Sequence, residues 1–330
     1  MPRSIPASLL ACLLILAGPL HARGVGVRML ETREPTTGTT VAAAVLYPSD
    51  QAGPDARSDF GPYAVAAQRD AAIAPGRHPL ILLSHGNGGS MFGHHDLAEA
   101  LARRGYVVAA LEHAGNSFRD QSGMGTDRVL LGRAWQASAV IKAVLADPRF
   151  QAHVDAARIG AAGFSAGGYT ALLLLGAKPD FTRFAVFCEK YPQTPEICDQ
   201  KIEKVGITIA DPPPTADARV RAAFAMAPLS LVFDKDGLKD VRAPVFLYAG
   251  SQDQVLLPDE NARRIRSLLP NLDAYREIEG AGHYVFLAPC PAALAQDAPQ
   301  ICTDPPGVDR AAVHRRIADD AAAFFDRTLK

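Results

Sequence analysis

Ser165 stands between two glycines in the segment Gly163-Phe-Ser-Ala-Gly167, where a strand-like run gives way to a helix-like run. The pattern before it predicts a strand over 158–164, and the apolar run after it, 169–175, predicts a helix. A turn this tight leaves no room for side chains beside the serine, so glycine has a steric reason to flank it. The helix N-terminus also favours negative charge nearby. The segment is therefore typical of a serine that attacks a carbonyl carbon.

A serine needs a base within hydrogen-bond reach, and that base needs an orienting acid. Asp253 follows the predicted buried strand 245–249 almost at once. His283 follows the predicted last strand, 274–278, in a glycine-rich loop. Because ligands of parallel sheets bind beyond the carboxyl ends of the strands, we expect these side chains to meet at one sheet edge. The sequence predicts Ser165, Asp253 and His283 as nucleophile, acid and base.

Each partner also has a plainer interpretation. Asp253 could be a turn or helix-cap residue, although Asp259 is better placed to cap the next helix. His283 could be a surface loop histidine, one of nine in the chain. Asp234 and Asp236, which follow the predicted strand 222–227, are the rival candidates for the acid.

An ester or amide hydrolase must also bind the negative oxygen of its intermediate with two N–H groups. The backbone N–H of Ala166 is one candidate. The second is expected from the loop 85–89, His-Gly-Asn-Gly-Gly, with Asn87 as donor. The glycines of that loop would equally serve a tight turn. His113 follows a neighbouring strand and is expected to line the pocket.

Composition restricts the other function classes. The chain has 330 residues, 48% hydrophobic residues and a net charge of −1. It therefore lacks the excess of positive charge that is typical of nucleic-acid-binding proteins. No charge run predicts a membrane-surface helix or stable membrane insertion. The nearest approach to metal-ligand spacing is His94-His95-Asp96, which we interpret as surface residues at a helix start. No cofactor and no metal are implied.

The elements that must position these residues alternate between strand and helix, which predicts an α/β fold with a mostly parallel sheet. Residues 23–330 are expected to form a single domain. The segment 50–77 is predicted to be a long loop with one helical turn near 65–70. The proline-rich segment 177–221 is predicted to be an insertion, which is either a lid over the site or a surface segment without a role in function. Further strands are predicted over 25–30, 40–46, 80–84 and 106–111, and further helices over 96–104, 126–146, 261–269 and 311–329.

The N-terminus is typical of a secretory signal peptide. A basic start precedes the apolar run 9–16, and Ala22 supplies a small residue before the expected cleavage. An uncleaved anchor and a lipoprotein attached through Cys12 are the alternatives. We therefore expect residues 1–22 to be removed and the protein to be exported, periplasmic or secreted.

Export would place the other four cysteines in an oxidising compartment, where three pairings are possible. Short spacings within proline-rich segments favour Cys188–Cys198 and Cys290–Cys302. Four free buried thiols are the alternative.

The glycine-flanked serine, the loop 85–89 and the segments that carry Asp253 and His283 together resemble those of α/β-hydrolases of the dienelactone hydrolase-like and platelet-activating-factor acetylhydrolase-like group. The chain departs from those families in three ways. Ser165 replaces the cysteine nucleophile of dienelactone hydrolases, and Phe164 stands where a histidine is common. The acetylhydrolases place their acid at the end of the strand that follows the helix after the nucleophile, but here that predicted strand ends at Ala227 without a carboxylate, which favours Asp253. The matching segments are Leu83-Ser-His-Gly-Asn-Gly-Gly89, Arg104-Gly-Tyr-Val-Val-Ala-Ala-Leu-Glu-His113, Gly163-Phe-Ser-Ala-Gly-Gly-Tyr-Thr-Ala171, Gly250-Ser-Gln-Asp253 and Gly282-His283.

The resemblance and the motifs predict a serine hydrolase that cleaves small-molecule carboxylic esters through an acyl-enzyme intermediate. A peptidase or amidase using the same three residues is the rival among enzymes. A hydrolase-fold binding protein without activity is the rival from another class.

Overall fold

The computed structural model describes residues 24–53, 55–198, 208–209 and 211–329. The predicted signal peptide, residues 1–22, and Cys12 within it lie outside the described residues.

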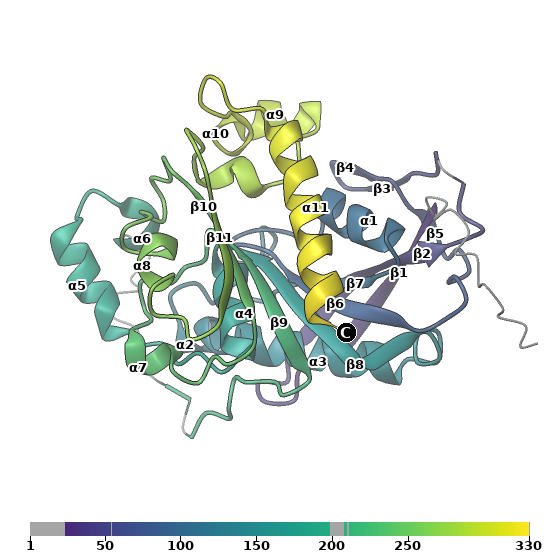
Figure 1. The fold of residues 1–330 in the computed structure, drawn as a ribbon, viewed down its shortest axis with the longest axis horizontal. Helices are drawn as coiled ribbons and strands as arrows, with labels where there is room; N and C mark the ends of the chain where they lie inside the picture. Colours follow the sequence, from purple (N-terminus) through teal and green to yellow (C-terminus); the bar gives the residue numbers. More distant parts are fainter. Residues whose placement is uncertain (1–23, 54, 199–207, 210, 330) are drawn as a thin grey trace, which may run out of the picture.

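In the described part of the chain, nine strands form one twisted sheet in the order β11-β10-β9-β8-β6-β7-β2-β1-β5 (Figure 1). The strands from β6 to β11 are parallel, and β2 joins them antiparallel to β7 and to β1. The predicted fold class is therefore confirmed. The strands are β1 Gly24–Arg33, β2 Thr40–Ser49, β5 Gln68–Arg69, β6 His78–Ser84, β7 Val107–Glu112, β8 Val154–Phe164, β9 Val220–Met226, β10 Val245–Gly250 and β11 Leu272–Ile278.

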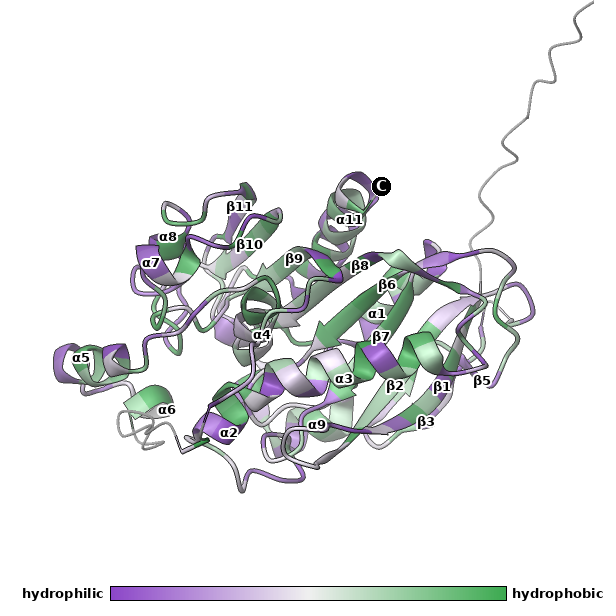
Figure 2. Cartoon of the chain, turned by 90° about the horizontal axis from the view of Figure 1, so that it is seen from below, coloured by the Kyte–Doolittle hydropathy of each residue, from purple (hydrophilic) through white to green (hydrophobic). Residues whose placement is uncertain are grey.

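Helices cover both faces of the sheet and divide the core into two layers. On one face α1 (His95–Arg103) and α11 (Arg310–Thr328) pack together, and on the other α3 (Gly132–Ala146) packs against α4 (Ala166–Leu174). Figure 2 shows α11 and α3 on opposite sides of the sheet. The central strands are buried on both faces, which explains why β6 reads as a continuous apolar run.

Smaller elements complete the fold. A short hairpin packs near α1, and the remaining helices lie mostly in the connections between strands. They are β3 Ser58–Phe60, β4 Tyr63–Val65, α2 Asp127–Leu130, α5 Thr182–Lys190, α6 Pro195–Cys198, α7 Lys235–Leu238, α8 Ala262–Ile265, the 3₁₀ turn η2 His283–Phe286, α9 Ala292–Asp297 and α10 Pro299–Cys302.

Three element predictions were wrong. Residues 65–70 contain no helical turn, because β5 pairs with β1 at Gly26 and Val27 and so takes an extended form. The helix expected over 126–146 divides at Leu131 into α2 and α3, just before a glycine, which weakens a helix. The helix expected over 261–269 is regular only through α8.

The stretch Asp127–Ala146 is long and apolar enough to cross a membrane by length and composition alone. However, 72% of its most apolar window is buried inside the protein, which is how a core helix behaves.

Two disulfides join the pairs that the cysteine spacing predicts. Cys188–Cys198 links α5 to α6 within the insertion, and Cys290–Cys302 closes the segment of α9 and α10. The second bridge follows η2 directly, so it constrains the chain that leaves this turn.

Candidate active site

Ser165 occupies a sharp turn between β8 and α4 at the carboxyl edge of the sheet. Its φ is 56° and its ψ is −118°, a conformation that is costly for a residue with a side chain. Its backbone N–H donates to the Met226 carbonyl at 2.9 Å, and its carbonyl accepts from the Leu229 N–H at 3.1 Å. The neighbouring segment after β9 therefore holds the strained turn in place.

The two glycines beside the serine meet the steric condition predicted for them. A Cβ on Gly163 would lie 2.3 Å from the backbone of Gly167. A Cβ on Gly167 would lie 1.9 Å from the carbonyl oxygen of Ser84. Neither neighbour is a flexible side chain, so no residue larger than glycine fits without moving the backbone.

Asp253 and His283 form a buried hydrogen-bonded pair. Asp253 Oδ2 lies 2.6 Å from His283 Nδ1, and the two residues are 3% and 5% exposed. The other carboxylate oxygen of Asp253 accepts from the backbone N–H groups of Val255 at 2.9 Å and Leu256 at 2.7 Å. The carboxylate is thus fixed by three donors, and the imidazole is oriented with Nε2 on its other side.

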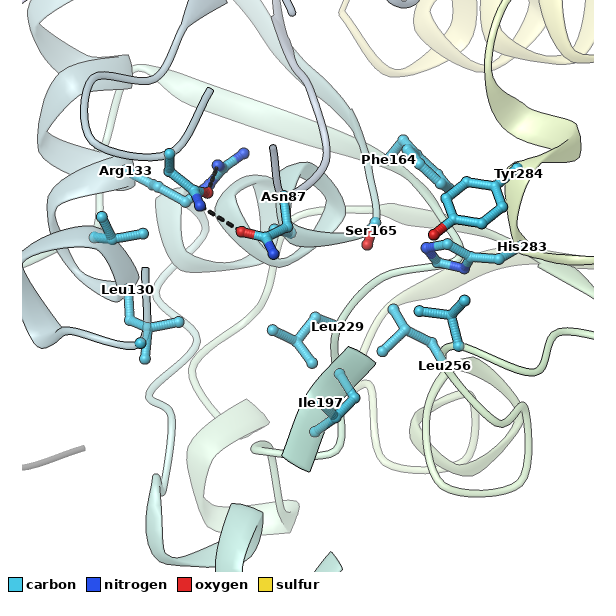
Figure 3. Close-up of a pocket in the computed structure, with 15 residues that line it drawn as sticks. Asn87, Leu130, Arg133, Phe164, Ser165, Ile197, Leu229, Leu256, His283 and Tyr284 are labelled. Atoms are coloured by element: carbon cyan, nitrogen blue, oxygen red, sulfur yellow. Dashed lines mark hydrogen bonds between the residues drawn. The ribbon is translucent and has the colours of Figure 1, made fainter. Parts of the chain in front are cut away.

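The three predicted catalytic residues come from loops after β8, β10 and β11. Ser165 and His283 line the same pocket, and in the view of Figure 3 Ser165 lies between Asn87 and His283. The fold therefore brings together residues that are 30 to 118 positions apart in the sequence.

The rival carboxylates have other roles. Asp234 caps α7 by accepting from the Gly237 N–H at 2.7 Å, and the side chain of Asp236 is 88% exposed. Asp259 does not cap α8 as expected, because Asn261 occupies that position and Asp259 pairs with Arg263 at 2.7 Å instead.

The two predicted oxyanion donors lie on the pocket wall. Ala166 is the first residue of α4, where the early N–H groups of a helix lack an intrahelical acceptor. Asn87 lines the pocket on the loop after β6, and its side-chain oxygen accepts from Asn116 Nδ2 (Figure 3). The contact with Asn116 could not be seen in the sequence pattern.

His113 does not line the pocket, contrary to expectation. It is fully buried behind the loop, where its ring contacts Ser84 Oγ at 2.8 Å and Gln136 Oε1 at 3.0 Å. Its backbone N–H donates to His85 Nε2 at 3.0 Å. Burial and the charge of Arg133 hold the pKa of His113 well below its usual value and lower that of His85 to about 3. Both rings are therefore neutral at pH 7.

The segment His94-His95-Asp96 is not a surface feature, because it packs under the turn that carries His283. His94 is 2% exposed and its Nδ1 lies 3.0 Å from the Phe286 carbonyl. Its ring also packs edge-on against Phe164, whose own ring lies 4.7 Å from that of His283. Phe164 thus fills the space beside His283.

Asp96 binds a second histidine on the terminal helix. Its Oδ2 lies 2.5 Å from Nδ1 of His314, whose Nε2 lies 2.8 Å from the Val285 carbonyl. Burial alone would lower the pKa of His314, but the hydrogen bond and charge of Asp96 outweigh it and raise that pKa. No group of three or more His, Cys, Asp or Glu side chains among the described residues is arranged to hold a metal ion.

The pocket in front of Ser165 has a volume of about 130 Å³ and is mostly apolar. Asn87, Asn116 and Arg133 form a polar wall on one side, and the insertion contributes Ile197 from α6. The sequence analysis missed Asn116, Arg133 and Ile197, whose local patterns carry no catalytic motif. The other apolar lining side chains are Val129, Leu130, Phe164, Leu229, Val255 and Leu256.

Comparisons with known proteins agree with this architecture. The model of the prolyl oligopeptidase family matches residues 94–283, which include all three predicted catalytic residues. The model of platelet-activating factor acetylhydrolase, isoform II, matches residues 45–128, which confirms that part of the expected resemblance.

A solved structure of a ferulic acid esterase from Streptomyces cinnamoneus superposes with a TM-score of 0.62 at 23% sequence identity. The superposition covers 95% of this chain and 92% of that one, and it supports the shared fold. The comparison with curated protein sequences found no match.

The prolyl oligopeptidase model spans more than half of the chain, and the sheet, the strained serine turn and the acetylhydrolase match all fit the same superfamily. The chain belongs to the prolyl oligopeptidase family of α/β-hydrolases and is a serine hydrolase.

Proposed function

We propose that this hydrolase cleaves carboxylic esters of small molecules, with Ser165 as nucleophile, His283 as general base and Asp253 as the orienting acid. The observation that carries the proposal is the buried Asp253–His283 pair beside a serine in a strained turn. Asp253 holds Nδ1 of the imidazole, so Nε2 is the nitrogen that can take a proton from the serine.

The proposed reaction has two steps, acylation of the serine and hydrolysis of the acyl-enzyme. Ser165 Oγ attacks the ester carbonyl carbon and loses its proton to His283, which then gives the proton to the departing alcohol. Water repeats the sequence on the acyl-enzyme, and the carboxylic acid leaves. The N–H groups of Ala166 and Asn87 bind the anionic oxygen of each tetrahedral intermediate.

An ester of modest size fits the pocket. The apolar wall gives an acyl or alkyl group a dry surface, and a pocket of about 130 Å³ is small beside most ligand sites. The insertion 177–221 helps set this limit because Ile197 belongs to the wall. We assign it a role in specificity.

We also propose that the protein is exported. The predicted signal peptide over residues 1–22 and the two disulfides support this together, since structural disulfides persist in oxidising compartments.

The experiment is a panel of p-nitrophenyl esters of increasing acyl length, with the wild type and Ser165→Ala. We expect turnover of short esters by the wild type, a fall beyond a limiting chain length, and loss of turnover in the variant with an unchanged melting curve. Activity retained in Ser165→Ala would contradict the assignment.

Peptide cleavage is the second candidate, and the match to the prolyl oligopeptidase model favours it. The described residues that line the pocket include no carboxylate to bind a peptide's amino terminus, which favours the ester. A prolyl p-nitroanilide measured beside the ester panel decides between them, because a peptidase would cleave the anilide whereas the proposed esterase would leave it intact.

A further inference from the structure

Arg133 is a buried cation on the pocket wall, and no carboxylate pairs with it among the described residues. It is 1% exposed. Its guanidinium donates to Thr170 Oγ1 at 3.0 Å, Asn116 Oδ1 at 2.5 Å, Ser84 Oγ at 3.2 Å and the His85 carbonyl. All four acceptors are neutral, so the hydrogen bonds are satisfied but the positive charge is not balanced.

This position is unfavourable for stability in two ways. A buried charge without an opposite partner loses hydration that neutral acceptors replace only in part. Arg133 also lies in the first turn of α3, where the helix dipole disfavours a cation and no acidic residue is present. Burial lowers the pKa of Arg133 to about 9, so the side chain remains charged at neutral pH. Residues that oppose local stability are expected where function requires them.

The contacts of Arg133 lead to the loop that carries the predicted oxyanion donor. It binds the His85 carbonyl directly, and it binds Asn116, whose amide in turn donates to the side chain of Asn87. Figure 3 shows Arg133 and Asn87 on the same side of the pocket. The guanidinium of Arg133 thus holds the loop at His85 directly and at Asn87 through Asn116.

We propose that Arg133 is a positioning residue for the oxyanion site, and that its unbalanced charge stabilises the negative oxygen of the tetrahedral intermediate. The inference rests on the proposed ester cleavage. The ester is neutral in the ground state and its carbonyl oxygen becomes negative only as the serine attacks, so the charge acts on the transition state. The effect should therefore fall on kcat rather than on KM.

The test compares Arg133→Met with Arg133→Lys and with a control, Arg219→Met. Arg219 is paired with Asp217 at the start of β9, at the opposite sheet edge. Removing a direct oxyanion donor lowers kcat by about 10²–10³-fold, so we expect about 10- to 100-fold for Arg133→Met, with KM within threefold. Arg133→Lys keeps the charge without the planar fork and should recover part of the loss. Arg219→Met should keep the wild-type kcat.

Asn116→Asp is the alternative variant to measure if Arg133→Met does not fold, because it keeps the guanidinium in place. It puts a carboxylate against Arg133, which balances the charge, and removes the donor to Asn87. A comparable fall in kcat is expected.

Inhibitor binding separates this role from a purely structural one. An alkylboronic acid forms a negative tetrahedral adduct with the serine, whereas an alkyl amide of similar size binds without charge. Arg133→Met should weaken boronate binding by about the factor lost in kcat and leave amide binding within twofold. Three results would overturn the proposal. They are equal weakening of both inhibitors, an unchanged kcat, and an increase in KM alone that is seen with negatively charged esters. If the wild type hydrolyses no ester, the proposed function fails and this inference with it. If the wild type hydrolyses esters and the Arg133 variants do so with the same kcat, this inference alone fails.

Discussion

Replacing Asp253 with asparagine should remove most of the turnover without unfolding the protein, because the new amide would hold His283 in the wrong tautomer. In the wild type, one carboxylate oxygen accepts from the N–H groups of Val255 and Leu256, and the other faces His283 Nδ1. Asparagine has one acceptor oxygen, and the two backbone donors would claim it. Its NH₂ group would then point at Nδ1 and make that nitrogen an acceptor.

The consequence is a proton on Nε2, the nitrogen that must receive the proton of Ser165. The corresponding change in another serine hydrolase lowers kcat by about 10⁴-fold, or roughly 5.4 kcal/mol of transition-state stabilisation at 1.36 kcal/mol per tenfold. We expect a loss of this order, measured as kcat for p-nitrophenyl acetate, with a melting temperature within a few degrees because the two backbone hydrogen bonds remain.

Asp234→Asn is the matched control, since it makes the same chemical change at the cap of α7. It should keep kcat within about twofold. If Asp253→Asn stays within tenfold of the wild type while folded, or if Asp234→Asn abolishes turnover, the acid has been assigned to the wrong residue.

Three further changes test the structure around the site. Gly167→Ala should give an unfolded or inactive protein, because the added methyl group would lie 1.9 Å from a backbone oxygen; yield and circular dichroism measure this. Replacing Cys290 and Cys302 with serine should lower stability by roughly 3 kcal/mol in denaturant titration, because the unfolded chain is no longer constrained. The pKa of His314 is raised by Asp96, so its stabilisation is complete below about pH 6.5 and is lost as pH rises through the folded pKa. His314→Gln should therefore lower the melting temperature more at pH 5.5 than at pH 9.

Each of these has a comparison variant. Gly53→Ala, with nothing within 4 Å of its added methyl group, should fold normally. For the disulfide, a reductant, which opens both bridges, should lower the melting temperature of the wild type. Identical melting curves with and without the reductant would contradict the predicted loss of stability. For the histidine, Asp96→Asn removes the charged partner and should show the same dependence on pH. A uniform shift at both pH values in His314→Gln would contradict the assigned charge.

The strand-and-helix alternation predicted the fold because buried parallel strands and their crossover helices have strong local patterns. Ser165, Asp253 and His283 could be predicted as site residues for a related reason: each follows a strand of the parallel sheet, and the carboxyl ends of such strands meet at one edge. The disulfide pairs could be predicted because the two cysteines of each pair lie close together in the sequence.

The errors arose where contacts between distant segments decide the outcome. Residues 65–70 form no helical turn because β1, some 40 positions away, pairs with Gln68 and Arg69. His94 resembles a surface residue in its local sequence, yet it is buried against the Phe286 carbonyl, 192 residues further on. Arg133 resembles an ordinary helix residue, and only its four contacts across the fold show what it supports.

The most direct test of the central claim is labelling of the wild-type protein with a fluorophosphonate, followed by digestion and mass spectrometry of the modified peptide. Such a probe reacts with a serine only when a neighbouring base activates it. We predict one adduct, on Ser165, whose formation abolishes ester hydrolysis and is lost in His283→Ala. An enzyme that hydrolyses esters while remaining unlabelled, or that carries its adduct on another residue, would contradict the claim.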